Sequence, residues 1–397
     1  MTSYHNISSL LDFFLDSLSK CNSFITTFLF FIAMLPLVVF STFYFQKQSQ
    51  RKVYMLDFAC FEAPTSLMST RARTIEMCKF LSGNWDEELV DFITYGMDKT
   101  GLGDSTYLSE ALVRVPPNPS MEASRKEAEM VMFGAIDELI AKTKNVIVSM
   151  DNIGILIVNC SVFNVVPCLA SMIINRYDLR EDISSYNVTG MGCSAGLLAI
   201  GLAKNLLQVH PDQYALVVST EIISEQVYLG KDRSKIATNC LFRLGGSAIL
   251  LSNLPSARNS SKYELLHNVH VNNAKSDISY NSIFLEEDPE GLIGITINKD
   301  LLVAAKSAME SNISILGQLI LPLSEKFRFL INLLVRNYMA SKLMPSRLRL
   351  ICDISGFRNK TVPEHYVPKF NKCVGECLLP HRLKFHFVLS FLPIYIR

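Results

Sequence analysis

Apolar runs and amphipathic stretches alternate through the middle of the chain. An unbroken apolar run such as 155–158, which leads into Asn159 and Cys160, is typical of a strand buried on both faces. Such runs predict strands over residues 53–60, 155–160, 183–188, 214–220, 244–251 and 266–271. Apolar positions that recur every three to four residues predict helices over residues 75–97 with a break at Gly83, 120–143, 166–176, 197–209, 299–311 and 323–344. This alternation indicates an α/β unit with a mainly parallel sheet, with a proline loop at 116–119 and a polar turn that begins at Glu286.

An uncharged segment, Cys21–Gln46, lies near the N-terminus. As a helix of about 26 residues that rises about 1.5 Å per residue, it would be about 39 Å long, enough to cross a hydrocarbon core of about 30 Å once. A cleavable signal peptide is disfavoured, because residues 1–19 carry no Lys or Arg and the apolar run is too long. Lys47, Arg51 and Lys52 follow the segment, so the positive-inside rule predicts a cytosolic location for the rest of the chain.

Charge and cysteine content narrow the functional classes. The chain has 397 residues, with 38 basic and 37 acidic side chains and a net charge of +1. No Lys/Arg stripe interleaves with aromatic residues, so a nucleic-acid partner is not expected. Ten cysteines, mostly scattered singly, indicate a reducing compartment with free thiols rather than a disulfide framework.

A glycine-bearing turn, Gly190–Gly196, separates a predicted strand from a predicted helix and reads Gly-Met-Gly-Cys-Ser-Ala-Gly. A cysteine at the first residue of a helix lies near unpaired backbone N–H groups and the positive end of the helix dipole, and both are expected to lower the pKa of its thiol. Small neighbours would let a thioester carbonyl approach Cys193, and backbone N–H groups would bind the oxyanion. The ordinary alternative is a buried, inert cysteine.

The same turn contains a second candidate nucleophile. Gly192, Ser194 and Gly196 match the G-x-S-x-G elbow of α/β-hydrolases, in which Ser194 would attack. That short pattern requires an acid and then a histidine downstream. The candidate histidines lie in no convincing context: His267, His270, His365, His381 and His386. The turn alone leaves Cys193 and Ser194 as alternatives.

A long, ordered set of blocks extends beyond the turn and covers roughly two-thirds of the chain. The blocks are residues 53–60, 114–119, 127–129, 131–135, 151–161, 186–196, 203–204, 206–210, 214–221, 239–243, 245–246 and 320–326. Together they resemble the plant 3-ketoacyl-CoA synthases, the condensing enzymes of very-long-chain fatty acid elongation. In that family the cysteine of Gly-Cys-Ser-Ala-Gly accepts the acyl group, so the resemblance favours Cys193 over Ser194.

The resemblance implies a two-stage reaction. Cys193 would attack an acyl-CoA thioester and release CoA. Malonyl-CoA would then lose carbon dioxide, and its carbanion would attack the acyl-enzyme. Hydrogen-bond donors must stabilise the enolate that develops on the malonyl thioester oxygen, and thiolase-like condensing enzymes use a His and an Asn, or two His, for this purpose. No metal or redox cofactor is implied.

The resemblance also implies a layout and a location. The expected fold is α/β, a thiolase-like layered αβαβα arrangement with an incomplete second half, preceded by a transmembrane helix. The expected segments are an N-terminal tail (1–20), a transmembrane anchor (21–46), the nucleophile half (53–255), a partial second half (256–370) and an atypical tail (371–397). The expected location is the endoplasmic reticulum membrane with the catalytic domain in the cytosol. The expected partners are acyl-CoA, malonyl-CoA, a second copy of the chain and other elongase subunits.

Two departures from the family concern the second stage. The family's His-x-Val-Arg-Thr-His segment corresponds to 267–272 here, where His267 is kept, His270 replaces Arg and Asn272 replaces the last His. Tyr366–Phe370 resembles a family block, but the His-Ala-Gly-Gly and His-Arg-Phe-Gly-Asn-like segments that hold the family's catalytic His and Asn do not follow it.

The departures leave a second hypothesis open. A non-catalytic member of the family would keep the nucleophile half and bind acyl-CoA or partner subunits. The tail also contains side chains of types that bind zinc, but a zinc finger needs a longer spacer between its Cys and His pairs. These side chains are Cys373, Cys377, His381 and His386.

Overall fold

A computed structural model describes residues 34–35, 51–81, 87–114, 116–143, 150–340 and 394–396. The predicted anchor (apart from residues 34–35), the segment 341–370 and the predicted tail (apart from residues 394–396) lie outside these ranges. The elements discussed below belong to the unit of residues 52–397.

The described strands are β1 (Tyr54–Cys60), β2 (Met68–Ser69), β3 (Thr106–Tyr107), β4 (Ile153–Asn159), β5 (Ser184–Val188), β6 (Tyr214–Thr220), β7 (Gly246–Ser252), β8 (Tyr263–Asn268), β9 (Ile283–Glu287), β10 (Ile293–Ile297) and β11 (Ile394–Ile396). The described α-helices are α2 (Arg71–Leu81), α3 (Glu87–Lys99), α4 (Glu110–Val113), α5 (Met121–Thr143), α6 (Leu169–Tyr177), α7 (Ala195–Val209), α8 (Ile223–Gln226), α9 (Arg233–Leu241), α10 (Asp277–Tyr280), α11 (Leu301–Ile320) and α12 (Leu323–Ala340).

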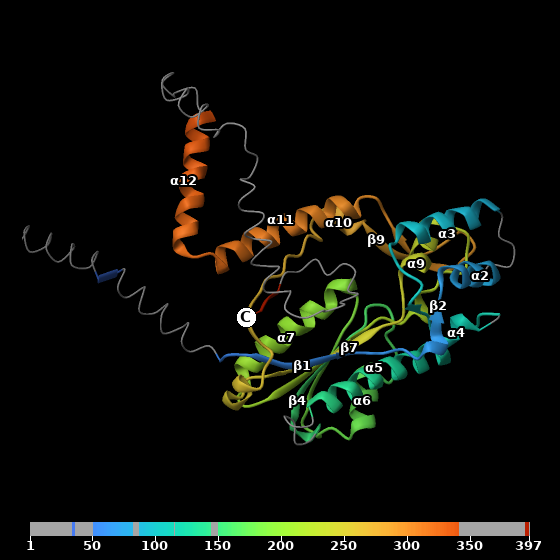
Figure 1. The fold of residues 1–397 in the computed structure, drawn as a ribbon, viewed down its shortest axis with the longest axis horizontal. Helices are drawn as coiled ribbons and strands as arrows, with labels where there is room; N and C mark the ends of the chain where they lie inside the picture. Colours follow the sequence, from blue (N-terminus) through green and yellow to red (C-terminus); the bar gives the residue numbers. More distant parts are fainter. Residues whose placement is uncertain are drawn as a thin grey trace, which may run out of the picture. The chain divides into compact units, whose positions relative to one another are not determined.

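The central feature is a seven-stranded sheet in the order β11-β8-β1-β7-β6-β4-β5. Side chains of successive residues in a strand point to opposite faces of a sheet, so each central strand serves two cores. Leu156 of β4 and Val218 of β6 face a core that includes α5 and α6, whereas Ile157 and Val217 face a core that includes α7. Figure 1 shows α5 and α6 on one side of the sheet and α7 on the other. The sheet is therefore covered on both faces, which explains the unbroken apolar runs in the sequence.

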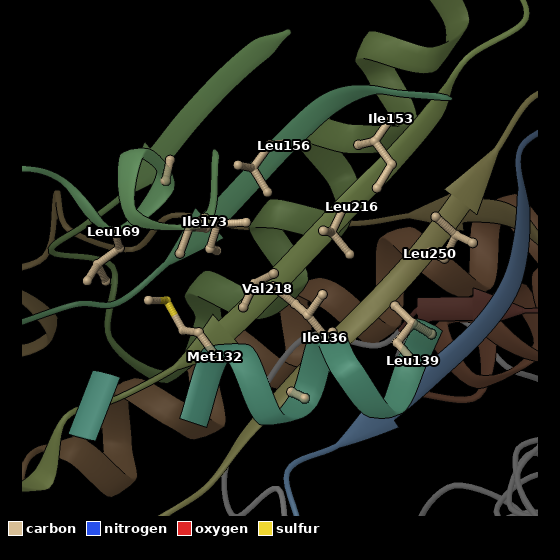
Figure 2. Packing of buried hydrophobic residues seen from close by; sticks show 14 of the residues in the cluster. Met132, Ile136, Leu139, Ile153, Leu156, Leu169, Ile173, Leu216, Val218 and Leu250 are labelled. Carbon is tan, nitrogen blue, oxygen red and sulfur yellow. The ribbon is translucent and has the colours of Figure 1, made fainter. Parts of the chain in front are cut away.

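The core beneath α5 combines side chains from one face of this helix with side chains from one face of the sheet. Met132, Ile136 and Leu139 follow one another at three- to four-residue spacing on α5, and all are buried. Figure 2 shows Ile136 and Leu139 pointing toward Leu216 and Leu250, which come from β6 and β7, and Met132 pointing toward Ile173 of α6. One face of a long helix thus closes one face of the sheet.

The expectation of a mainly parallel sheet is wrong. β4 is parallel to β5 and to β6, but β6–β7, β7–β1, β1–β8 and β8–β11 are antiparallel. The connection from β6 to β7 carries α8 and α9, whose apolar residues Ile223 and Ile236 pack into a separate core with α3. Because this connection does not cross back over the sheet, β7 returns in the opposite direction.

Several predicted boundaries also differ from the structure. Pro167 does not lie in the first turn of α6, because the helix begins at Leu169 after the N-cap Cys168. Glu286 belongs to β9, which forms a two-stranded sheet with β10, and the turn begins only at Asp288. β8 begins and ends three residues before the predicted strand, and α11 extends well beyond the predicted helix.

The structure otherwise confirms the elements that form the site. β4, β6 and α7 lie where the pattern predicted them. The segment Gly192–Val209 is apolar enough to cross a membrane by length and composition alone. In the fold, however, Ala199, Ala203 and Leu207 of α7 are fully buried against the sheet.

Candidate active site

The candidate nucleophile Cys193 lies in a 3₁₀ turn, Gly192–Ser194, that leads directly into α7. Gly190 and Gly192 have φ angles of +70° and +58°. Side chains rarely tolerate such left-handed conformations, so two glycines allow the chain to reverse from β5 into α7 within a few residues. The reversal places Cys193 at the surface, exposed, which is not the position of a fully buried core cysteine.

Ser194, the alternative nucleophile, has a structural partner. Its hydroxyl donates a hydrogen bond to the carbonyl oxygen of Met191, at 2.8 Å. Within the described ranges no histidine is hydrogen-bonded to this hydroxyl. The bond closes the 3₁₀ turn, and it gives Ser194 a role in shaping the turn that holds Cys193.

The loop that follows β4 fixes the position of the nucleophile turn. The Ser161 hydroxyl donates to the Gly192 carbonyl oxygen at 3.1 Å, and the Ser161 carbonyl oxygen accepts from the Gly190 N–H at 3.0 Å. β4 and β5 are parallel neighbours, so their carboxyl ends meet at one edge of the sheet. Ser161 therefore joins the end of one strand to the turn that follows the other.

Glu221, directly after β6, is hydrogen-bonded to Ser161. Its two carboxylate oxygens accept the Ser161 N–H at 2.9 and 3.0 Å, and one of them accepts from Gln226 Nε2 at 3.1 Å. Burial raises the pKa of the Glu221 carboxyl, although the hydrogen bonds from Ser161 and its other donors lower it in part. The sequence had indicated no role for Glu221. The available signal was its position as a charged residue immediately after a buried strand.

The thiol of Cys193 differs electrostatically from the expectation. Partial burial of the sulfur, which removes water from it, and the negative charge of Glu221 raise the pKa of the Cys193 thiol, and the hydrogen bond with its own backbone N–H only partly opposes them. The prediction of a lowered pKa is therefore wrong. A helix terminus favours the thiolate, but a carboxylate placed beside the same thiol disfavours it. A base or a cation must counter this effect before Cys193 attacks at neutral pH.

Glu127 of α5 supports the segment that carries Glu221 and Gln226. Its buried carboxylate accepts the N–H groups of Ile223 and Ser224, at 2.7 and 3.0 Å. These are the first two residues of α8, whose backbone donors would otherwise be unpaired. Gln226 also lines a small apolar cavity with eight other residues: Met77, Leu108, Leu112, Ile223, Val227, Thr238, Asn239 and Phe242.

The first turn of α7 lies very close to the sheet. A Cβ atom on Gly196 would come within 3.2 Å of the Ser219 hydroxyl oxygen, so a glycine suits this approach. The buried Asn159 amide oxygen also lies at this point and has no described hydrogen-bond partner. Small residues in the motif thus let α7, and with it Cys193, lie directly against the ends of β4 and β6.

The histidine segment, residues 267–272, begins in β8, which lies beside the nucleophile helix α7. β8 is joined to α7 through Lys204, whose ammonium donates to the Leu266 carbonyl oxygen at 2.8 Å, and through Asn268. His267 lies in β8, half-buried, and His270 lies beyond the strand, exposed. In the described part of the chain no histidine is hydrogen-bonded to the Cys193 thiol.

The remaining candidates lie elsewhere. The Asn272 side chain accepts the Ala274 N–H at 2.9 Å, a local turn contact. The other histidines and the tail cysteines named above are outside the described ranges: His365, His381, His386, Cys373 and Cys377. Within those ranges no group of three or more metal-ligating side chains is present.

Comparison with known sequences identifies relatives. The profile of the family described as FAE1/Type III polyketide synthase-like protein matches residues 44–338. 3-Ketoacyl-CoA synthase 11 of Arabidopsis thaliana is 47% identical over 314 residues, which are 79% of this chain and 61% of the relative. 3-Ketoacyl-CoA synthase 2 of the same plant is 47% identical over 302 residues, 76% of this chain and 56% of the relative. The chain thus spans about three-fifths of the length of these relatives.

Solved structures share the fold. The C-terminal type III polyketide synthase domain of Steely1 from Dictyostelium superposes with a TM-score of 0.54 at 16% identity, over 67% of this chain and 73% of that chain. PKS-I from the brown alga Ectocarpus siliculosus gives 0.55 at 16% identity, over 68% and 74%. At this identity the likeness concerns the fold, a mixed α/β architecture of the thiolase-like type.

Proposed function

This chain belongs to the FAE1/type III polyketide synthase-like family, and from that membership we propose that it is a condensing acyltransferase. The proposed reaction joins a very-long-chain acyl-CoA to malonyl-CoA and yields 3-oxoacyl-CoA, CoA and carbon dioxide. The observation that carries the proposal is Cys193, exposed at the start of α7 within the segment that is 47% identical to two 3-ketoacyl-CoA synthases.

In the first stage the Cys193 thiol loses its proton and its sulfur attacks the carbonyl carbon of the acyl thioester. The tetrahedral intermediate collapses by breaking the bond to the CoA sulfur, and the departing thiolate takes up a proton. Backbone N–H groups of the turn are the available donors for the oxyanion. Ser161 and Glu221 act here as positioning residues, because Ser161 is hydrogen-bonded to the turn and Glu221 is hydrogen-bonded to Ser161.

In the second stage the carbon–carboxylate bond of malonyl-CoA breaks, carbon dioxide leaves, and the electron pair forms an enolate. The enolate carbon attacks the acyl–Cys193 thioester and expels the Cys193 thiolate. An enolate at neutral pH requires donors on its oxygen. His267, which matches the family pattern and lies next to α7 in β8, is the candidate that the described residues offer.

The proposal extends to the organisation of the chain. Residues 53–255 form the nucleophile half, 256–370 a partial second half, and 371–397 an atypical tail. Residues 1–20 precede a membrane anchor at 21–46, which retains the protein in the endoplasmic reticulum membrane with residues after 46 in the cytosol. We also propose that the chain forms a homodimer through the nucleophile half and contacts other elongase subunits.

A second candidate is a non-catalytic member that binds acyl-CoA or partner subunits. The observation that favours it is the raised pKa of Cys193, whose thiol is partly buried and lies near the negative charge of Glu221. Such a protein would still accept an acyl group slowly, but it would not release 3-oxoacyl-CoA.

The test is condensation of radiolabelled malonyl-CoA with acyl-CoA in membranes that contain the full chain. We expect labelled 3-oxoacyl-CoA, which disappears in Cys193→Ala and remains in the matched control Cys168→Ala. Mass spectrometry of intact protein measures acylation of Cys193 separately. Acylation without condensation would reject the enzyme in favour of the binding protein, and acylation of Ser194 would reject both.

A further inference from the structure

Two side chains outside the nucleophile turn donate hydrogen bonds to the same carboxylate oxygen of Glu221. The Cys160 thiol donates at 3.7 Å, within the longer reach of a sulfur atom, and the Gln226 side-chain amide donates at 3.1 Å. The Ser161 N–H approaches both oxygens of this carboxylate. Glu221 is therefore held by donors from two segments, the residues that follow β4 and the helix α8.

Cys160 is suited to act as a permanent donor. It is 1% exposed, and burial, together with the charge of Glu221, raises the pKa of its thiol to about 12. The thiol therefore keeps its proton over the physiological pH range. A buried cysteine often serves only as a small apolar side chain, and Cys160 does belong to the core beneath α5. Its hydrogen bond adds a second role, because the acceptor is a carboxylate that acts on Cys193.

Gln226 approaches the same carboxylate from α8. This short helix is fixed at its start by Glu127, which accepts the N–H groups of Ile223 and Ser224. Gln226 is buried and lines the small apolar cavity beside α8. An amide in such surroundings loses its contact with water, so the hydrogen bond to Glu221 favours one orientation of the side chain.

Glu221 is joined to the nucleophile by hydrogen bonds and by charge. It accepts the N–H of Ser161, whose hydroxyl donates to the carbonyl oxygen of Gly192, the residue before Cys193. Its negative charge adds to the effect of burial in raising the pKa of the Cys193 thiol. Donors on a carboxylate stabilise its charge and offset part of the field that it exerts on neighbouring groups. The donors on Glu221 therefore change the reactivity of the nucleophile.

We propose that Cys160 and Gln226 are positioning residues for the nucleophile. Their hydrogen bonds hold the Glu221 carboxylate on the Ser161 N–H and weaken the repulsion between this carboxylate and the Cys193 thiolate. Both residues act through Glu221. The inference rests on the proposed function, since it takes Cys193 as the nucleophile, but it does not require that the chain complete the condensation.

The titratable groups around Glu221 come from several elements. Cys160 follows β4, and Cys193 lies in the turn before α7. Glu127 of α5 is bound to the start of α8, and Glu225 of α8 is hydrogen-bonded to α5. Carboxyl groups titrate below the range of about pH 8–9 in which a thiol begins to ionise, and Cys160 titrates above it. Ionisation of Cys193 can therefore be followed in that range while its neighbours keep their charge.

The test measures how fast iodoacetamide alkylates Cys193 as a function of pH, in the full chain in detergent solution without acyl-CoA. Peptide mapping by mass spectrometry follows the Cys193 peptide alone. Cys160→Ala removes one donor to Glu221, and Cys160→Ser keeps a donor at the same position. Gln226→Met removes the other donor at nearly unchanged side-chain length. Cys240→Ala is the matched control, because Cys240 is also a buried cysteine but packs in the separate core with α3.

We expect alkylation of Cys193 to be about two- to fivefold slower at a given pH in Cys160→Ala and in Gln226→Met, with the midpoint of the profile moved to higher pH. Cys160→Ser should react at a rate closer to that of the unchanged protein, and Cys240→Ala should match the unchanged protein. In a Glu221→Gln background, Cys160→Ala and Gln226→Met should have almost no effect, because the charge through which they act is gone.

An unchanged profile in both donor variants would overturn the inference, and so would equal slowing in Cys160→Ser and Cys160→Ala. Slowing that persists in the Glu221→Gln background would overturn it as well. A rate that falls equally at every pH, with no shift of the midpoint, would show a distorted turn instead of a change in charge and would also reject it. The expected profiles in a protein that does not condense malonyl-CoA would support the inference and reject the proposed function alone.

Discussion

The most informative single change lies outside the nucleophile turn, at Glu127. Its carboxylate accepts the backbone N–H groups of Ile223 and Ser224 at the start of α8, and the Ser224 hydroxyl also donates to it. Glu127→Ala removes this acceptor and leaves two buried backbone donors without a partner. Each such donor costs about 1–3 kcal/mol, so the free energy of unfolding should fall by about 2–6 kcal/mol.

The assay is equilibrium urea unfolding of the full chain in detergent solution, followed by circular dichroism. Glu122→Ala is the matched control on the same helix. Its carboxylate is exposed and pairs with Lys126 one turn away, so its removal should leave the stability nearly unchanged. A loss of stability in Glu127→Ala as small as that of Glu122→Ala would refute the reasoning.

The pH dependence of the same variant gives a second measurement. Burial raises the pKa of the Glu127 carboxyl, although its hydrogen bonds from Ser224 and Ile223 oppose the rise. The folded state therefore holds this proton more tightly than the unfolded chain does. Its contribution to stability is fully present below the unfolded pKa of about 4.3 and is lost as pH rises through the folded pKa. Glu127→Ala should thus lose more stability at about pH 4 than at about pH 7, and the opposite order would contradict this sign.

Three further predictions concern the site and the sheet. Glu221→Gln removes the negative charge that raises the pKa of the nucleophilic thiol, so iodoacetamide should alkylate that thiol faster at a given pH; an unchanged rate would contradict this. Burial raises the pKa of Cys168, but hydrogen bonds at the start of α6 lower it by more. Peptide mapping after alkylation at neutral pH should therefore find Cys168 modified before Cys193, and the reverse order would refute this prediction. Gly246→Ala would place a Cβ atom 2.4 Å from the buried Val131 side chain and should cost about 1–3 kcal/mol in urea unfolding, whereas Gly245→Ala meets nothing within 4 Å and should be nearly neutral.

The local pattern of apolar and polar residues was sufficient to predict the strands and the helix that build the site. β6 was predicted at its observed bounds, and α7 was predicted within two residues of its start, because burial on both faces and one-sided helical burial leave distinct periods in the sequence. Short elements were harder. β9 was missed, since its exposed residues carry no burial pattern and its partner β10 supplies the pairing.

The sequence predicted only part of the candidate site. The sequence located Cys193 and, by the glycines of the turn, its placement between a strand and a helix. It did not find Glu221 or Ser161, because their contacts with the turn join residues that are distant along the chain. It also gave the wrong direction for the pKa of Cys193, since a helix terminus is visible in the sequence but a neighbouring carboxylate is not.

By itself the sequence determined the order of the strands and helices that build the site, the nucleophile turn and the family, because these depend on neighbouring residues and on extended similarity. The tertiary structure alone decided that β7 runs antiparallel to β6. It also decided that Glu221 is hydrogen-bonded to Ser161 and raises the pKa of the Cys193 thiol. Strand direction depends on the path that a connection takes through space, and a pKa depends on burial and on charges that the fold brings together. Neither quantity is a property of any short stretch of residues.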